Sequence, residues 1–275
     1  MNRLEKLGTK RAFFLFSVLF AALHVAPRAR SAAEFDHSHK IWTLLLQKSV
    51  TVKGHASVVN YKILKSDPTE LHAYLRTLES VSQGEFGKFS NNEKLAFLIN
   101  AYNAFTIKLI LGRYPAKSIK HAGEWSLSNP TASPWKTKFF TLLGERRHLD
   151  NIEHDMIRKS FNEPRIHFAV VCASVGCPAL RNEAFVAVNI EKQLEDAAQN
   201  FLSDKNRNRY LPEAKKLEVS AIFKWYGSDF TKKYGSLEAF LAPRITMNPE
   251  HQTIIFEKKA ATSYLDYDWS LNEEK

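Results

Sequence analysis

The chain has 275 residues, of which 44% are hydrophobic and 25% are charged, values that suit a globular protein and exclude a disordered or collagen-like chain. The net charge of +10 points toward nucleic acid, but six of the 39 basic residues and only one of the 29 acidic residues lie in the first 33 positions. The remaining basic residues are scattered and form no long block, so we expect no nucleic-acid partner.

Residues 1–33 have the order of a secretory signal peptide. A basic start is followed by the apolar run Ala12–Ala26 and then by the small residues Ser31–Ala33, which resemble a cleavage site. This run of fifteen residues is short for a membrane span, which needs about 20. An uncleaved anchor is the alternative, because Arg28 and Arg30 follow the run. We therefore expect a signal peptide over 1–33 and a periplasmic or secreted mature protein without an integral membrane span.

The first elements of the mature chain alternate between helix and strand. Apolar spacing predicts an amphipathic helix over His39–Ser49 and a helix that starts at Asp67 and runs to Leu78. The apolar segment Val58–Leu64 between them predicts a short strand.

Ser90–Arg113 predicts the longest helix. Ser90 and Glu93 form a capping box, and a broad apolar face follows. Asn100 and Asn103 are three positions apart on this helix and lie in or beside its apolar face. A buried amide without partners costs about 1–3 kcal/mol, so both side chains need hydrogen-bond partners.

The second half of the chain predicts further elements of both kinds. They are a strand within Lys136–Leu143, a helix over Ile152–Phe161, a buried strand at Ile166–Val171, a long helix that starts at Asn189, and a late strand at Thr253–Phe256. No linker rich in Gly, Ser or Pro interrupts the mature chain. We predict a single domain over 34–275, α+β and mostly helical, with a small central β-sheet.

Both cysteines lie just after the predicted buried strand. Cys172 is at its end, and Cys177 precedes Pro178, a residue favoured in the first turn of a helix. A sulfur at a helix N-terminus has a lowered pKa and a larger thiolate fraction. The spacing of the pair matches neither the C-x2-C redox motif nor half of a zinc site. The pattern therefore predicts a reactive thiol near a strand–turn–helix.

A cysteine nucleophile needs a base within reach, and the base needs an orienting group. His154 is the candidate base, and Glu153, Asn103 or Asn100 could orient it or stabilise an oxyanion. His167 would face away from Cys172 if the strand continued straight between them.

Each of these residues also has a structural explanation. In an oxidising compartment Cys172 and Cys177 could form a small disulfide, and Glu153 could simply cap a helix. His167 could be a core histidine, and Asn100 and Asn103 could tie a neighbouring loop. The same applies to five aromatic residues expected in the core: Trp225, Tyr226, Tyr264, Tyr267 and Trp269.

Several blocks resemble the family known as domain of unknown function 547 (DUF547). They are its N-A-Y-N-A helix at Leu95–Leu111, its L-D-x-I-E-H block at Leu149–Arg158, its H-F-A-x-x-C-A-S-x-x-C-P block at His167–Leu180, and two C-terminal blocks at Phe223–Phe230 and Tyr267–Asn272. The resemblance covers roughly residues 58–272. The plant branch of this family keeps the sulfur that matches Cys172 but not the one that matches Cys177. The resemblance therefore implies that Cys172 is the nucleophile.

The combination of Cys172, His154 and Glu153 also resembles the sites of cysteine hydrolases and transglutaminases. We therefore expect a thiol-dependent hydrolase or acyltransferase that acts on an amide bond of a peptide or a cell-envelope cross-link, with Cys172 as nucleophile and no cofactor. The alternatives are a non-enzymatic envelope-binding domain with a Cys172–Cys177 disulfide, and thiol–disulfide exchange by the two sulfurs. A metal site of His154, His167 and Cys172 is a further alternative, although its spacing matches no standard zinc site.

Overall fold

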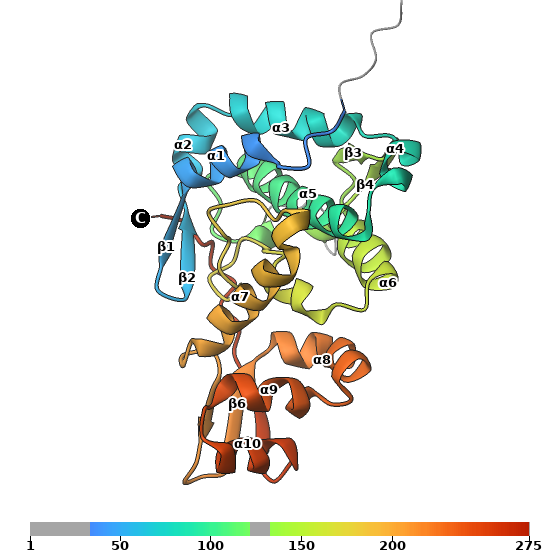
Figure 1. Cartoon of the computed structure of the whole chain (residues 1–275). Coiled ribbons are helices and arrows are strands. Elements are labelled where there is room, and N and C mark those ends of the chain that lie inside the picture. Colours follow the sequence, from blue (N-terminus) through green and yellow to red (C-terminus); the bar gives the residue numbers. More distant parts are fainter. Residues whose placement is uncertain (1–33, 122–132, 275) are drawn as a thin grey trace, which may run out of the picture. The chain divides into compact units, whose positions relative to one another are not determined.

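The computed structural model describes residues 34–121 and 133–274 (Figure 1). The predicted signal peptide and its cleavage site lie outside the described residues. The chain divides into an N-terminal unit, Met1–Glu34, and a second unit, Phe35–Lys275, which contains all the elements below.

Helices dominate the second unit, as predicted. The α-helices are α1 (Lys40–Ser49), α2 (Tyr61–Ser66), α3 (Thr69–Ser80), α4 (Gln83–Lys88), α5 (Asn91–Arg113), α6 (Arg158–Ser160), α7 (Ile190–Ser203), α8 (Ile222–Tyr234), α9 (Leu237–Ile245) and α10 (Pro249–Phe256). A π-helix, η3 (Asn151–Ile157), leads into α6. Short 3-10 helices are η1 (Ile119–His121), η2 (Pro134–Lys136), η4 (Pro164–Phe168) and η5 (Ala187–Asn189).

The strands form three small separate sheets in the described part of the chain, so the prediction of one central sheet is wrong. Two are hairpins, β1 (Val50–Lys53) with β2 (Ala56–Val59) and β3 (Phe140–Leu142) with β4 (Glu145–Arg147). In the third, β6 (Lys216–Ser220) pairs antiparallel with β5 (Arg209–Leu211) and parallel with β7 (Ala261–Leu265).

Helix α5 is the central element of the larger core, and its predicted capping box is confirmed. The Ser90 Oγ accepts from the Glu93 N–H at 3.3 Å, and the Glu93 carboxylate accepts from the Ser90 N–H at 2.7 Å. From Leu95 to Leu111 every residue except Lys108 is buried. Among the described residues, α5 is the helix long and apolar enough to cross a membrane, but 89% of its apolar window is buried inside the protein. Such a helix is typical of a protein core.

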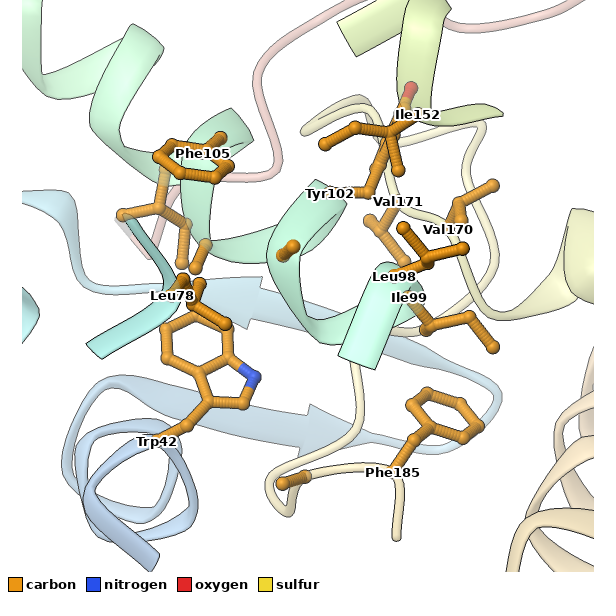
Figure 2. Close-up of a cluster of buried hydrophobic side chains, with 14 of the residues drawn as sticks. Trp42, Leu78, Leu98, Ile99, Tyr102, Phe105, Ile152, Val170, Val171 and Phe185 are labelled. Atoms are coloured by element: carbon orange, nitrogen blue, oxygen red, sulfur yellow. The ribbon is translucent and has the colours of Figure 1, made fainter. Parts of the chain in front are cut away.

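Two groups of apolar side chains make up the core. The larger one surrounds α5 and includes Trp42, Leu78 and Phe105, as Figure 2 shows. The smaller one joins α7, α8 and α9 around Phe168 and Phe230. The two cores flank η4, because Ile166 belongs to the first and Phe168 to the second.

The buried strand predicted at Ile166–Val171 is wrong, because this segment begins as the 3-10 helix η4. Pro164 occupies its first turn, and the Glu163 carboxylate accepts from the Arg165 N–H at 3.1 Å. A short apolar run fits a buried strand and a buried helical turn equally well. Here its side chains serve two different cores, which favours the helical turn.

Two further strand predictions are overturned, in part or in full, at capping asparagines. Val58 and Val59 of the predicted strand Val58–Leu64 end β2, but the rest form α2 after its cap Asn60, whose side chain accepts from the Ile63 N–H. The segment Thr253–Phe256 ends α10, where Asn248 accepts two backbone N–H groups. Asparagine is a strong N-cap, and in both cases this local signal outweighs the β-branched composition.

Candidate thiol site

The two cysteines lie on a tight loop that follows η4. The Cys177 N–H donates to the Ser174 carbonyl at 3.0 Å, and Ala173 has a left-handed backbone with φ of 63°. This turn folds the loop back on itself, so that the two Sγ atoms lie 2.8 Å apart. No helix begins at Pro178, so the predicted helix N-cap at Cys177 is wrong. The chain continues without helix, and the Leu180 N–H donates to the Ser57 hydroxyl.

The C-terminal segment crosses directly over this loop. Its Asp268 and Ser270 carbonyls accept from the Gly176 and Val175 N–H groups, both at 2.8 Å. A Cβ at Gly176 would lie 3.0 Å from the backbone of Asp268, so a larger residue would force the crossing segment to shift by a few tenths of an ångström. The crossing places the Tyr267 hydroxyl 3.3 Å from the Cys172 Sγ and 3.0 Å from the Cys177 Sγ.

Cys177 is the better-stabilised thiolate of the pair. Its sulfur accepts from the Cys172 N–H at 3.1 Å and from the Tyr267 hydroxyl, and it shares a hydrogen bond with the Cys172 sulfur. Burial raises its pKa, but these hydrogen bonds outweigh burial, and the net pKa of Cys177 lies below the ordinary thiol value. The hydrogen bond with Cys177, and then burial, raise the pKa of Cys172 well above that value. The pair is therefore asymmetric, and thiolate character is favoured at Cys177 over Cys172.

Both sulfurs line a pocket with a volume of about 390 Å³, within the range of small-molecule sites. The wall also carries aromatic rings, two carboxylates and two imidazoles. The described lining residues are Tyr102, Trp135, Asp150, Glu153, His154, His167, Val170, Cys172, Cys177, Pro178, Ile222, Trp225, Tyr226, Tyr267 and Trp269. The structure therefore brings Cys172, Cys177, His154, His167 and Glu153, five of the predicted site residues, to one cavity.

His167 is buried at one wall of this pocket, in an ion network. Its Nε2 lies 2.8 Å from the Asp229 carboxylate, and its Nδ1 lies 3.9 Å from Glu153. The ring stacks on Tyr226 with centroids 3.8 Å apart. Burial lowers the pKa of His167, although the hydrogen bond with Asp229 opposes this. Because no strand joins His167 to Cys172, the predicted opposite orientation does not apply, and both line the pocket.

His154 and Glu153 lie on the π-helix η3. The His154 Nδ1 lies 3.1 Å from the Arg158 guanidinium, and its Nε2 lies 3.9 Å from Asp150. Arg158 itself forms a bidentate pair with Asp229 at 2.6 and 2.8 Å. Glu153 is buried. Burial, and then the contact with Glu153, raise the pKa of the Tyr226 hydroxyl. In the described structure neither imidazole makes a hydrogen bond to a sulfur.

Asn100 and Asn103 bind backbone rather than the imidazoles. The Asn103 amide donates to the Ala169 carbonyl at 2.9 Å and accepts from the Val171 N–H at 2.8 Å. The Asn100 amide makes the same pair of bonds with the backbone of Phe185. These contacts match the alternative in which both amides tie a neighbouring segment. Asn103 thereby holds the chain that leads into Cys172.

The aromatic residues expected in the core have two different environments. Trp225 and Tyr264 are exposed, with 44% and 43% of their surface accessible, so the prediction of core positions is wrong for them. Tyr226, Tyr267 and Trp269 are partly buried, and they line the pocket. The placement of Tyr267, Asp229 and Arg158 in the site could not be inferred from local spacing. The available signal was that all three lie within blocks of the family resemblance, Arg158 at the end of Leu149–Arg158 and Asp229 and Tyr267 in the two C-terminal blocks.

No group of three or more His, Cys, Asp or Glu side chains suited to a metal ion occurs among the described residues. His154, His167 and Cys172 share a pocket, but each has other partners: Arg158 for His154, Asp229 for His167, and Cys177 for Cys172.

The protein is a mostly helical α+β domain with three small sheets in its described part. Its pocket is lined by a pair of cysteines whose sulfurs are in contact. Residues 86–202 match the model of the family described as "Protein of unknown function, DUF547". The match confirms the predicted resemblance over this segment, which holds α5, both cysteines, His154 and His167, and the chain therefore carries a DUF547 region. The two C-terminal blocks lie beyond the matched residues. Neither a search of curated proteins nor a search of solved structures found a match.

Proposed function

We propose that this protein carries out thiol–disulfide exchange with its two cysteines. The observation that carries the proposal is the 2.8 Å contact between the Cys172 and Cys177 sulfurs at a pocket wall. A pair in such contact can close to a disulfide with little movement of the loop. A thiolate is the attacking species in this chemistry. Cys177, whose hydrogen bonds lower its pKa, accepts the proton of Cys172 as the Cys172 sulfur attacks.

The more accessible Cys172 starts the exchange, since only 4% of Cys177 is exposed. The Cys172 proton passes to the Cys177 thiolate as the Cys172 sulfur attacks a substrate disulfide. One substrate half leaves as a thiolate, and the other remains bound to Cys172 as a mixed disulfide. Cys177 then attacks the Cys172 sulfur, and its proton goes to the departing substrate thiol. The protein is oxidised to a Cys172–Cys177 disulfide, and the substrate disulfide is reduced by two electrons to one thiolate and one thiol, which carry the charge and the proton of the starting pair.

The apolar N-terminal run supports export, and we propose a periplasmic or secreted location. Exported proteins meet disulfides regularly, whereas cytosolic proteins rarely do. This compartment supplies both oxidised and reduced protein thiols as partners for the pair.

The test is to equilibrate the purified protein in glutathione buffers of graded redox ratio, and then to alkylate free thiols and locate the label by mass. We expect the Cys172–Cys177 disulfide to form and to disappear reversibly within the range of the buffers. Cys177→Ser should instead accumulate glutathione on Cys172, because the resolving sulfur is missing. A disulfide that resists every buffer and opens only under strong reductant would make the pair a structural staple and overturn the proposal. A pair that remains a dithiol throughout would overturn it as well.

A second candidate is a thiol-dependent hydrolase or acyltransferase that acts on amide bonds. It is favoured by one observation: His154, His167 and Glu153 line the same pocket as Cys172. In this reaction the Cys172 sulfur forms an acyl-enzyme, His154 takes the thiol proton and passes it to the leaving amine, and water releases the acid.

The two candidates differ in which residues they require. Amide cleavage needs Cys172 and His154 but not Cys177, whereas exchange needs both sulfurs and no imidazole. Turnover of peptide or cell-wall amides by Cys177→Ser, together with its loss in Cys172→Ala and His154→Ala, would establish the hydrolase.

A further inference from the structure

The pocket of the sulfurs is acidic in its described lining. Glu153 is 5% exposed, and the Asp150 side chain is 19% exposed. No Lys or Arg belongs to the described lining residues. A buried carboxylate at a pocket wall favours a positively charged occupant over a negatively charged one.

Two cations near this lining, Arg158 and Lys120, are already paired or stacked. Arg158 is neutralised by its bidentate pair with Asp229. Lys120 lies over the Trp269 ring, 3.9 Å from the centroid, and Lys136 is exposed near Asp150. Among the described residues, Asp150 also interacts with His154 at 3.9 Å, with His148, and more weakly with Lys136. Lys136 acts from solvent, where its attraction is weak.

Aromatic faces cover another part of the wall. Tyr267 and Trp269 have centroids 4.5 Å apart, and Trp225 packs against both at 5.0 and 5.7 Å. The contact of Lys120 with Trp269 shows that the Trp269 ring accepts an ammonium group on its face. A cation over an aromatic face gains about 0.5–2 kcal/mol, depending on how far it is desolvated.

We infer that the substrate is a small disulfide that carries an ammonium group near its sulfur, of the aminoalkyl disulfide class. This inference rests on the proposed exchange at Cys172 and Cys177. The disulfide is placed at the sulfurs beside Tyr267, and the ammonium is held by the carboxylates of Asp150 and Glu153 and by the aromatic wall. A carboxylate in the same position would meet two like charges.

Three disulfides of similar length and different charge test this inference. They are cystamine, which is cationic, bis(2-hydroxyethyl) disulfide, which is neutral, and 3,3'-dithiodipropionate, which is anionic. The rate of oxidation of the reduced protein by each is divided by the rate for free 2-mercaptoethanol, an uncharged thiol, at the same pH and ionic strength, which removes the intrinsic reactivity of each disulfide. We expect the normalised rate for cystamine to exceed that for dithiodipropionate by about tenfold or more.

Asp150→Asn and Glu153→Gln should lower the rate for cystamine severalfold and leave the neutral disulfide little changed. Asp155→Asn is the matched control, because Asp155 lies on the same π-helix but outside the pocket lining and bonds only Asn151 and Lys159. Equal normalised rates for the three disulfides would refute the charge preference while leaving the exchange in place. If none of the three disulfides reacts faster with the protein than with 2-mercaptoethanol, the proposed function itself fails.

Discussion

The hydroxyl of Tyr267 lies 3.0 Å from the sulfur of Cys177, although 90 residues separate them in the chain. The contact exists because the C-terminal segment hydrogen-bonds to the cysteine loop at Val175 and Gly176. The properties of the dithiol therefore depend on a segment outside the matched family region. This dependence leads to the first two predictions.

Tyr267→Phe should make the thiol pair less reactive at neutral pH. The change removes a hydrogen bond that lowers the pKa of Cys177, so the thiolate fraction at a given pH falls. A hydrogen bond to a charged group contributes about 1.5–3 kcal/mol, and we expect alkylation near pH 7 to slow by about tenfold. The pH profile of alkylation should move to higher pH. Tyr264→Phe, on an exposed ring, is the control, and a profile unchanged in Tyr267→Phe would contradict the role assigned to Tyr267.

Gly176→Ala should destabilise the protein by about 1–3 kcal/mol, as overpacking does. The new Cβ would lie 3.0 Å from the Asp268 backbone and from the Tyr267 ring, so the C-terminal segment must move away. Denaturant unfolding measures the loss, and alkylation should slow as in Tyr267→Phe. Gly87→Ala is the matched control, since a Cβ there meets nothing within 4 Å. Equal stability of the two variants would show that the close crossing is not required.

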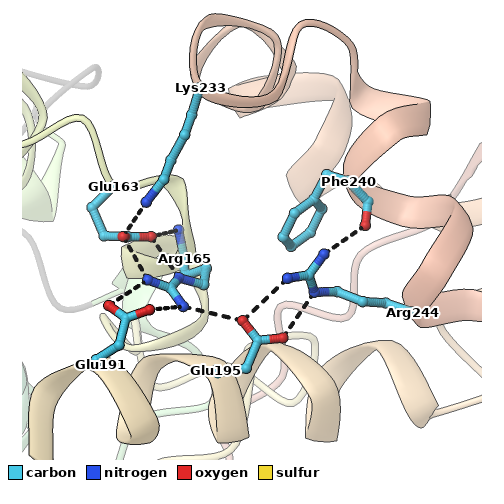
Figure 3. Close-up of polar contacts among 7 residues, drawn as sticks. All are labelled: Glu163, Arg165, Glu191, Glu195, Lys233, Phe240 and Arg244. Atoms are coloured by element: carbon cyan, nitrogen blue, oxygen red, sulfur yellow. Dashed lines mark hydrogen bonds and ion pairs between the residues drawn. The ribbon is translucent and has the colours of Figure 1, made fainter.

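Arg165→Met should lower the free energy of unfolding by about 3 kcal/mol, because it leaves the largely buried carboxylate of Glu163 with fewer partners. Arg165 is 5% exposed and bonds Glu163, Glu191 and Glu195, which join η4 to α7 (Figure 3). Lys192→Met removes an exposed pair with Asp196 and should cost less than about 1 kcal/mol. The two free energies of unfolding give the comparison, and similar losses would mean that burial of Arg165 is unimportant.

His39 should make the protein less stable in mild acid. Its Nδ1 lies 2.7 Å from the Tyr74 hydroxyl, and burial lowers its pKa to about 4 from 6.5. Between these values the unfolded chain binds the proton more tightly than the folded one, so stability falls as the pH drops from about 6.5 to about 4. At about 1.36 kcal/mol per pKa unit, the full loss is about 3 kcal/mol.

The check is the difference in unfolding free energy between pH 7.5 and pH 4.5. This difference should shrink in His39→Gln, which removes the titrating ring, and stay as in the wild type in His72→Gln, at an exposed position on α3. The same acid sensitivity in His39→Gln and in the wild type would assign the effect to other groups.

Local signals in the sequence were sufficient for the longest helices. The capping box at Ser90 and the dense apolar run after it predicted α5, and the amphipathic spacing after Asn189 predicted α7, because each signal acts within a few residues. Where two local signals competed, as at Thr253–Phe256, the capping residue prevailed over β-branched composition.

The sequence by itself determined the residue types of the site, namely the cysteine pair, His154, His167 and Glu153, all within about 25 positions of one another. Tertiary structure alone decided how they are used. Asp229 contacts the His167 imidazole at hydrogen-bond distance, although it lies 62 positions away in the chain. Tyr267 contacts the Cys172 sulfur, although it lies 95 positions away. Periodicity reports only on neighbours along the chain, whereas these contacts depend on how α8 and the C-terminal segment pack against the cysteine loop.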